Sequence, residues 1–422
     1  MQQNNERKVA ARVLHEVIEN KAYTNITLRK VFAESNLDSR AKAFVTDMVN
    51  ETMRNLLHID HVLNSFSKTP VAKMKPFIRN LLRISVCQLL YMEEIPPHAA
   101  INEAVRLTKQ VGLVGLSGFV NGVLRNISRA NMHQTSDFAI KYSYPTWLWE
   151  KLVYWLGQKE AEAFAITSHS PPSVSVCVNT YKTTVEDLQK LLEAEGVTSE
   201  ELETKPFLVL KKPGDISRLA SFKKGMFFVM DSGAYSAIIE LDPKPGQTII
   251  DMCAAPGGKS FATAVKMENR GQVLSFDLHK HKVELLKQGA LRLGLSCISP
   301  AMQDSSVLNP KLENLADAVL LDAPCSGFGT IRKHPEMKYS RTMKDVLELA
   351  KIQNELINTA AKYVKPGGKL VYCTCTVTKE ENQHVVEKFL KQNENFKLKS
   401  SKQLLPMSDS DAFFVASFIK VI

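Results

Sequence analysis

The amino-acid sequence predicts a multidomain protein with an all-α domain, a small α+β unit and an α/β domain, in that order. In the first third of the chain, apolar residues recur at helical spacing, and no alternation of apolar and polar residues is long enough to predict a strand. Residues 173–235 mix short alternating runs with one helical segment. From residue 236 onward, β-forming runs and helical segments alternate, with glycine turns between them. A chain of 422 residues is too long to fold around one ordinary hydrophobic core, so two or three domains are expected.

Residues 1–135 form the predicted all-α domain. Helices are expected at Lys75–Met92, Ala100–Val111 and Phe119–Ile127, where apolar residues recur at spacings of three and four. This part carries 18 Lys and Arg against 11 Asp and Glu, and so holds most of the chain's net charge of +10. A basic domain favours a polyphosphate partner through counterion release. Charge alone also allows a basic surface without a ligand, and it does not distinguish RNA from DNA.

Residues 136–235 are predicted to form a helical connector and a small α+β unit. The polar, proline-bearing stretch Ser168–Pro172 is the strongest linker signal. After it, strands are expected at Val174–Val178, Phe207–Leu210 and Met226–Met230, and a helix at Val185–Glu195.

Residues 236–422 are predicted to form an α/β domain of the Rossmann-like kind. Helices at Lys280–Leu293 and Met343–Val364 separate β-forming runs. Those runs are Thr248–Met252, Gln272–Phe276, Cys297–Ala301, Ala318–Leu321, Gly368–Tyr372 and Phe413–Phe418. This alternation implies a parallel sheet with helices on both faces.

A glycine turn follows the first strand of the α/β domain, in the segment Asp251–Ser260. It is not a P-loop, because that pattern needs glycine where Cys253 stands, and the dinucleotide fingerprint is also absent. Asp277 ends the second strand, about 20 residues past the turn, where a carboxylate typically binds ribose hydroxyls. Asp304 follows the third strand and could accept a hydrogen bond from the exocyclic amine of an adenine ring. A nucleoside without a phosphate site indicates S-adenosylmethionine, although each acid alone is also consistent with a helix cap.

Two cysteine motifs follow neighbouring β-forming runs, namely Asp322-Ala323-Pro324-Cys325 and Tyr372-Cys373-Thr374-Cys375. Thiolates are strong nucleophiles, so this pattern points to covalent catalysis. A thiolate that adds to carbon 6 of cytosine would make carbon 5 able to accept a methyl group, and Asp322 would stabilise charge on the ring. The spacing of Cys373 and Cys375 leaves open which one is the nucleophile.

The other cysteines are expected to be reduced and structural. Buried packing is the simpler interpretation for Cys87, Cys177 and Cys297, and it is also favoured for Cys253 in the cofactor turn. Paired C-x-x-C elements are missing, so no metal site is predicted. No apolar run approaches a membrane span and the first residues lack a secretory pattern. A cytoplasmic, monomeric protein with no membrane partner is therefore expected.

At these motifs the chain resembles the RNA cytosine-C5 methyltransferases of the Nop2/Sun type, over nearly its whole length. Within that family it is most similar to the bacterial small-subunit ribosomal RNA group. Its N-terminal third resembles the antitermination factor NusB. The residues that carry this second resemblance are Arg83–Tyr91, Ile95-Pro96, Ala99–Val105 and Phe119–Arg125.

The resemblance implies roles for individual residues. It makes Cys375 the nucleophile, Cys325 the thiol that assists product release, and Asp322 a residue of both the catalytic and the cofactor site. The implied cofactor residues are Cys253, Ala254, Ala255, Pro256, Gly257, Gly258, Lys259, Asp277 and Asp304. For the segment after Cys325, which includes Arg332, His334, Pro335 and Glu336, loop anchoring and RNA contact remain equal alternatives.

The implied function is methyl transfer from S-adenosylmethionine to carbon 5 of a cytosine in 16S ribosomal RNA. A transfer RNA substrate is the alternative. A non-catalytic RNA-binding factor would be expected to lack a thiol or an intact cofactor loop, and a small-molecule methyltransferase would leave the basic domain without a purpose. Three segments depart from the family pattern: Cys177-Val178-Asn179, Met230-Asp231 and Asp411-Ala412.

Overall fold

The computed structural model describes residues 5–130, 135–204 and 206–421, and the chain divides into two compact units. The first unit contains Met1–His169 and Lys333–Ser340, and the second contains Ser170–Arg332 and Arg341–Ile422. The chain therefore passes between the units three times. The first passage, between His169 and Ser170, lies inside the predicted linker.

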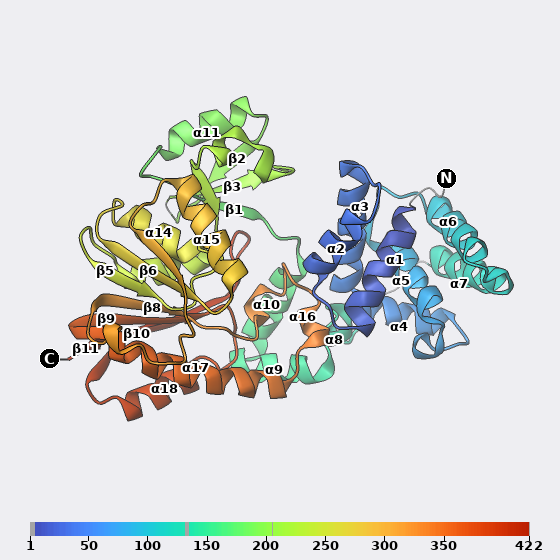
Figure 1. The fold of residues 1–422 in the computed structure, drawn as a ribbon. Coiled ribbons are helices and arrows are strands. Elements are labelled where there is room, and N and C mark those ends of the chain that lie inside the picture. The colour runs from blue at the N-terminus through green and yellow to red at the C-terminus, as the bar shows by residue number, and fades with distance from the viewer. Residues whose placement is uncertain (1–4, 131–134, 205, 422) are drawn as a thin grey trace. The chain divides into compact units, whose positions relative to one another are not determined.

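The described residues of the first unit are helical, and the predicted all-α fold is confirmed (Figure 1). Its helices are α1 (Glu6–Glu19), α2 (Thr24–Ala33), α3 (Ser39–Arg54), α4 (Leu56–Phe66), α5 (Pro76–Tyr91), α6 (Pro97–Gln110), α7 (Ser117–Arg129), α8 (Phe138–Lys141), α9 (Thr146–Leu156), α10 (Gln158–His169) and α16 (Met337–Ser340). None of the helices in the described ranges is long and apolar enough to cross a membrane.

Helix α5 is the centre of the first unit. Pro76 occupies its first turn, where proline costs no hydrogen bond. The helix is buried on most sides and packs against α1, α3, α4, α6 and α7. Leu81, Leu82 and Val86 are fully buried in the cluster formed with α4, α6 and α7, while Ile84 joins the cluster formed with α1 and α3. The helix predicted over Lys75–Met92 is therefore the element that joins the two apolar clusters.

The segment Lys333–Ser340 belongs to the helical unit although it follows the Pro-Cys motif in sequence. Lys338 is fully buried, and its Nζ donates to the carbonyls of Arg54 (2.9 Å) and Tyr142 (3.2 Å). The Tyr339 hydroxyl donates to the carbonyl of Met53 at 3.0 Å, and a Glu336 carboxylate oxygen accepts from the backbone N–H of Thr24 at 3.2 Å. Glu336 thus anchors the segment, one of the two roles left open by its sequence.

The second unit begins with a small antiparallel sheet in the order β2-β3-β1-β4. Its elements are β1 (Val174–Val178), α11 (Val185–Ala194), β2 (Thr198–Glu201), β3 (Phe207–Lys211), α12 (Ala220–Lys223) and β4 (Phe227–Val229). Three strands and the helix were predicted, whereas β2 was not. Asn179, after β1, donates through Nδ2 to the carbonyls of Gly225 (2.9 Å) and Leu293 (3.0 Å) and so connects this sheet to the larger domain.

The larger domain contains a seven-stranded sheet in the order β10-β11-β9-β8-β5-β6-β7. Its elements are α13 (Ser236–Leu241), β5 (Thr248–Asp251), α14 (Gly258–Lys266), β6 (Gln272–Asp277), α15 (Lys280–Leu293), β7 (Ile298–Met302), β8 (Ala316–Asp322), α17 (Met343–Tyr363), β9 (Val364–Thr374), α18 (Gln383–Gln392), β10 (Phe396–Leu404) and β11 (Phe413–Lys420). The Rossmann-like prediction is confirmed, with one correction. The sheet is mixed, because β11 pairs antiparallel with β9 and with the unpredicted β10.

Helices cover both faces of the seven-stranded sheet (Figure 1). Alternate residues along each strand point to opposite sides. Leu320 and Val371 join the apolar cluster under α13, α14 and α15, whereas Leu321 and Leu370 join the cluster under α17 and α18. The parallel strands β5, β6, β8 and β9 consequently end at one edge, where polar side chains can gather without disturbing either cluster.

Candidate active site

The two cysteine motifs meet at the carboxyl edge of the sheet. Strands β8 and β9 are parallel neighbours, and Asp322 is in register with Cys373. The segment after β8 turns back across the end of β9, where the Gly329 N–H donates to the Cys375 carbonyl at 2.9 Å. This places the Sγ atoms of Cys325 and Cys375 at 3.3 Å from each other. Two thiols 50 residues apart in sequence therefore share one site.

Cys373 and Cys375 have different environments although two positions separate them. Strand β9 ends at Thr374, so Cys375 lies just beyond it. Cys373 is fully buried in the apolar cluster, and its thiol donates to a carboxylate oxygen of Asp322 at 3.6 Å. Cys375 is only partly buried. Burial raises the pKa of the Cys373 thiol well above its usual range, so this side chain is held as a neutral thiol.

The sulfur atoms of Cys325 and Cys375 are in contact, and this contact affects the protonation of Cys325. The hydrogen bond with Cys375, followed by burial, raises the pKa of the Cys325 thiol well above its usual range. Cys325 thus retains its proton at neutral pH, and it can donate a hydrogen bond to the sulfur of Cys375.

Asp322 and Lys259 form an ion pair beside the thiols. Lys259 Nζ donates to Asp322 Oδ2 at 2.7 Å and lies 5.1 Å from the ring centre of Phe413. Burial opposes the charged form of Lys259, but attraction to Asp322 outweighs it and raises the pKa of the lysine. The ammonium is therefore fixed in the charged state. Lys259, in the first turn of α14, thus connects this helix to the end of β8.

The predicted cofactor loop lies over the ends of three adjacent strands. The N–H of Met252 donates to the carbonyl of Leu320 in β8 (3.0 Å), and the N–H of Ala254 donates to the carbonyl of Phe276 in β6 (2.8 Å). Gly257 has a φ of +117°, which favours glycine. A Cβ there would collide with the ring of Phe261, so this glycine also makes room for α14 to pack.

Three acids at consecutive strand ends, Asp251 and the predicted cofactor residues Asp277 and Asp304, differ in exposure. Asp251 and Asp277 are buried, whereas Asp304 is exposed and accepts from the N–H and hydroxyl of Ser306. Asp251 accepts from the Ser260 hydroxyl at 2.6 Å, and burial raises the pKa of Asp251 to about 7. Oδ1 of Asp251 and Nε2 of Gln303 are buried atoms without a hydrogen-bond partner in the described structure. Buried polar atoms of this kind require a partner, which a bound ligand can supply.

The remaining cysteines pack in apolar surroundings, as predicted. Cys87, Cys177 and Cys297 are buried, and Cys253 packs against the apolar cluster under α17. All seven cysteines are free thiols. Within the described residues, no group of three or more His, Cys, Asp and Glu side chains is arranged to hold a metal ion.

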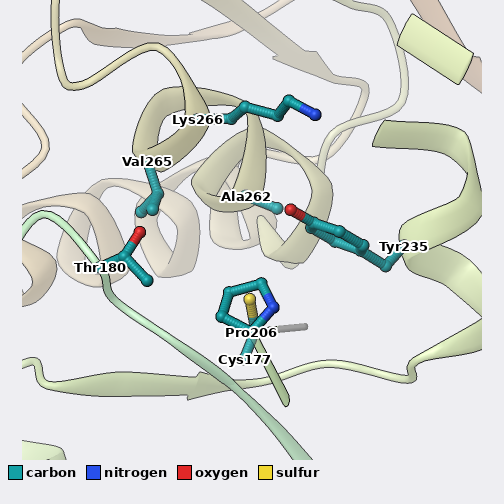
Figure 2. Close-up of a pocket in the computed structure, with 7 residues that line it drawn as sticks. All are labelled: Cys177, Thr180, Pro206, Tyr235, Ala262, Val265 and Lys266. Atoms are coloured by element: carbon teal, nitrogen blue, oxygen red, sulfur yellow. The ribbon is translucent and has the colours of Figure 1, made fainter. Parts of the chain in front are cut away.

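The second unit also has a pocket of about 300 Å³ between α14 and the region of β1 and β3, shown in Figure 2. Its lining residues are Cys177, Thr180, Pro206, Tyr235, Ala262, Val265 and Lys266. None of them belongs to the thiol site or to the predicted cofactor residues. Cys177, which stands in the segment that departs from the family pattern, forms its apolar floor together with Pro206.

Some residues of the site were not recognised in the sequence. Glu381, Gln353 and Asn382 are completely buried beneath the two thiols. In the sequence, Glu380-Glu381-Asn382 reads as a polar loop, and Gln353 reads as one more polar residue of a long helix. Their burial depends on tertiary packing, so neither spacing nor composition could have revealed it.

Three family models match consecutive parts of the chain. The NusB family model matches residues 4–129, and a model of the ferredoxin-like domain of RsmF/B-like methyltransferases matches residues 144–217. The model of the 16S rRNA methyltransferase RsmB/F matches residues 238–419, which include both cysteine motifs.

A curated relative in Bacillus subtilis, the probable ribosomal RNA small subunit methyltransferase B, is 37% identical over 94% of this chain and 90% of its own. The chain belongs to the ribosomal RNA small subunit methyltransferase B family. A probable member from a Synechocystis species is 31% identical over 96% of this chain and 93% of its own. The crystal structure of PH0851 is 29% identical, covers 99% of both chains and has a TM-score of 0.81.

S-adenosylmethionine is the cofactor of this methyltransferase family. The residues at the sheet edge fit such a ligand. Its sulfonium and ammonium groups are cationic and its ribose carries hydroxyl donors, while Asp251 and Asp277 present carboxylates at the ends of adjacent strands. The buried Oδ1 of Asp251 and Nε2 of Gln303 are respectively an acceptor and a donor without partners, as a nucleoside ligand requires.

Proposed function

We propose that this protein transfers a methyl group to carbon 5 of a cytosine in small-subunit ribosomal RNA, with Cys375 as the covalent nucleophile. The observation that carries this proposal is the 3.3 Å separation of the Cys325 and Cys375 sulfur atoms at the edge of the sheet, beside Asp322 and Lys259. Methyl transfer to a carboxylate, hydroxyl or amine would need no such pair of thiols, whereas activation of a pyrimidine carbon needs a nucleophile.

S-adenosylmethionine, when bound, supplies the methyl group on a cationic sulfur, with Asp277 and Asp304 proposed on its ribose and adenine side. Cys375 releases its thiol proton to solvent, and its Sγ then bonds to carbon 6 of the cytosine. The electron pair of the double bond between carbons 5 and 6 moves onto carbon 5. Asp322, held by Lys259, stabilises the ring during this addition. Carbon 5 then takes the methyl group.

Release requires carbon 5 to lose its proton to solvent while the bond between carbon 6 and Cys375 breaks. The electron pair of the carbon–hydrogen bond restores the ring double bond, and sulfur departs as a thiolate. The protonated thiol of Cys325 donates a hydrogen bond to this departing sulfur, which assists the step. Two thiols in contact, one that forms the adduct and one that keeps its proton, serve both halves of the reaction.

Ribosomal RNA is proposed over transfer RNA because the relatives that match over nearly the whole chain are named ribosomal RNA small subunit methyltransferases. The basic helical unit supports an RNA substrate in general, since cationic side chains attract the phosphate backbone.

The test is to replace each of the neighbouring cysteines. Cys375→Ala should abolish transfer of labelled methyl groups to small-subunit RNA, because the nucleophile is lost. Cys373→Ala should retain most of the activity, since Cys373 is buried and points its thiol at Asp322. Bisulfite sequencing of the RNA identifies 5-methylcytosine as the product. An unmethylated transfer RNA, assayed in parallel, tests the alternative substrate.

A 5-fluorocytosine RNA gives an independent measurement, because fluorine at carbon 5 cannot leave as a proton and the adduct persists. A stable protein–RNA adduct at Cys375 is expected by mass spectrometry. Full activity in Cys375→Ala, or an adduct located on Cys373, would refute the assignment.

A further inference from the structure

Glu381 lies beneath the two reactive thiols and is completely buried. Its Oε1 accepts from the N–H of Ser326 at 2.8 Å and from Nε2 of Gln353 at 3.0 Å. Its Oε2 accepts from the hydroxyls of Ser326 at 2.5 Å and Thr378 at 2.8 Å. A single carboxylate therefore receives four hydrogen bonds. This set compensates for the burial of a charged group.

The partners of Glu381 flank both cysteines. Ser326 directly follows Cys325, and its hydroxyl also contacts the hydroxyl of Thr376, which directly follows Cys375, at 2.8 Å. Gln353 donates from the same Nε2 to the carbonyl of Pro324 at 2.9 Å, on the other side of Cys325. The backbone on either side of Cys325 and the residue after Cys375 thus belong to one hydrogen-bonded group.

Glu381 is itself fixed in place by the strand that ends at the site. Its carbonyl accepts from the hydroxyl of Tyr372 in β9 at 2.6 Å. The next residue, Asn382, accepts from Thr374 at 2.6 Å and donates to the Thr376 carbonyl at 3.1 Å. The segment that carries the carboxylate is therefore attached to the residues on both sides of Cys375, Thr374 and Thr376.

The charge of Glu381 also acts on the thiols. Its negative charge is one of the causes that raise the pKa of Cys325, after the hydrogen bond with Cys375 and burial. Burial raises the pKa of Glu381 itself, although its four hydrogen bonds oppose the shift. A carboxylate at this position thus favours a protonated Cys325.

We propose that Glu381 is a positioning residue that sets the separation of the Cys325 and Cys375 thiols by binding the segments that follow each of them. Its role in turnover rests on the function proposed above, whereas its role in the geometry does not. It does not contact the pyrimidine and acts through Ser326 and its partners. Loss of the carboxylate removes the four hydrogen bonds through which Glu381 holds these segments, and it misplaces Cys325.

The geometry is tested without RNA, by oxidising the full-length protein with diamide. The diamide takes two electrons and the thiols of Cys325 and Cys375 lose their two protons as a disulfide forms. Peptide mapping measures the rate at which this cross-link appears. Glu381→Ala should slow it at least about tenfold relative to wild type, since intramolecular reactions depend steeply on proximity.

Three further variants separate positioning from folding. Glu381→Gln keeps the size and one acceptor, so its cross-linking rate should lie between those of wild type and Glu381→Ala. Ser326→Ala removes two of the side-chain contacts and should also slow cross-linking. Glu387→Gln changes an exposed carboxylate on α18 and should leave the rate unchanged. Near-ultraviolet circular dichroism verifies that each variant is folded.

Turnover supplies the second measurement. A misplacement of about 1 Å can lower a rate by roughly a hundredfold, so Glu381→Ala should lower kcat by about ten- to a hundredfold with KM for RNA nearly unchanged. Because the defect lies at release, the covalent adduct with unmodified RNA should accumulate, and Cys325→Ala, which lacks the assisting thiol, should behave in the same way.

The outcomes distinguish this proposal from the function on which it rests. Cross-linking at the wild-type rate in folded Glu381→Ala overturns the positioning role, even if turnover falls. Slow cross-linking in Glu381→Ala supports it, whether or not the protein methylates carbon 5. Failure of wild-type protein to form any RNA adduct would instead count against the proposed function alone.

Discussion

A single residue of the helical unit, Lys338, is charged in the unfolded chain but buried in the folded one. Burial, and then the nearby Arg54, lower the pKa of Lys338 well below its ordinary value of 10.5. The folded protein therefore binds this proton more weakly than the unfolded chain does. Between the two pKa values the unfolded state holds more protons, so stability rises with pH.

Replacement of this lysine by an uncharged side chain removes that pH dependence. Wild type should gain stability relative to Lys338→Met, by at most about 1.4 kcal/mol per pH unit, as pH rises toward the ordinary lysine pKa of 10.5 that applies to the unfolded chain. All three tryptophans lie at positions 147–155, in α9 and thus in the helical unit, so their fluorescence during urea unfolding of the full chain reports this unit. If the free energy of unfolding had the same dependence on pH in both proteins, the prediction would be contradicted.

The sequence predicted which residue types carry the chemistry better than it predicted where each side chain lies and how deeply it is buried. The motifs around Cys325 and Cys375 could be recognised because strand ends in parallel sheets carry functional groups. The difference between Cys373 and Cys375 could not, because it arises where β9 ends and where the next residues turn. Glu381 was missed for a related reason, since a polar loop residue becomes buried only when four donors surround it.

At the scale of elements, the loop between β8 and α17 lies between two other segments of the sheet edge. Gly329 donates to the Cys375 carbonyl and accepts from the N–H of Ala412, which precedes β11. A Cβ at Gly329 would lie 2.7 Å from the Cys375 carbonyl oxygen and would also collide with that of Ala412. Backbone atoms on both sides leave no room for a side chain.

Gly329→Ala should therefore push the end of β9 away from the start of β11. We expect a loss of about 1–3 kcal/mol in stability, as for other overpacked sites, together with lower methylation activity. Gly118→Ala, in α7, is the matched control because nothing lies within 4 Å of its added Cβ. Chemical denaturation followed by circular dichroism measures both, and equal stability of the two variants would exclude the steric explanation.

Elements with an apolar period were predicted well, and polar edge strands were not. Helix α15 has the predicted bounds, Lys280–Leu293, because its apolar positions repeat at helical spacing. Strand β10 (Phe396–Leu404) contains the polar run Lys399–Lys402 and forms only by pairing with β11. The same holds for β2, whose four residues Thr198–Glu201 are all polar. Both segments form strands because neighbouring strands pair with them, and not because of their local sequence. The antiparallel pairing of β11 with β9 and β10 also makes the larger sheet mixed.

At the scale of the whole molecule, the helical unit is built from two separate parts of the chain. A fragment that ends at His169 would lack Lys333–Ser340 and would leave the carbonyls of Arg54, Met53 and Tyr142 without these donors. We expect the fragment to be less stable than the same unit in the full chain, because unsatisfied buried carbonyls cost about 1–3 kcal/mol each.

A synthetic peptide of residues 330–342 should restore part of that stability. The midpoint of urea unfolding, followed by tryptophan fluorescence, should rise with the concentration of the peptide. A peptide with Tyr339→Phe lacks the hydroxyl that binds Met53 and should be less effective. No response to either peptide would mean that the segment contributes little to the unit.

This divided construction has a consequence for the order of events during biosynthesis. His169 is synthesised 164 residues before Lys333 (333 − 169). At roughly 5–20 residues per second, the nascent helical part waits on the order of 10 to 30 s for its last piece. During this interval, its incomplete interior is a natural substrate for chaperones that protect newly made polypeptides.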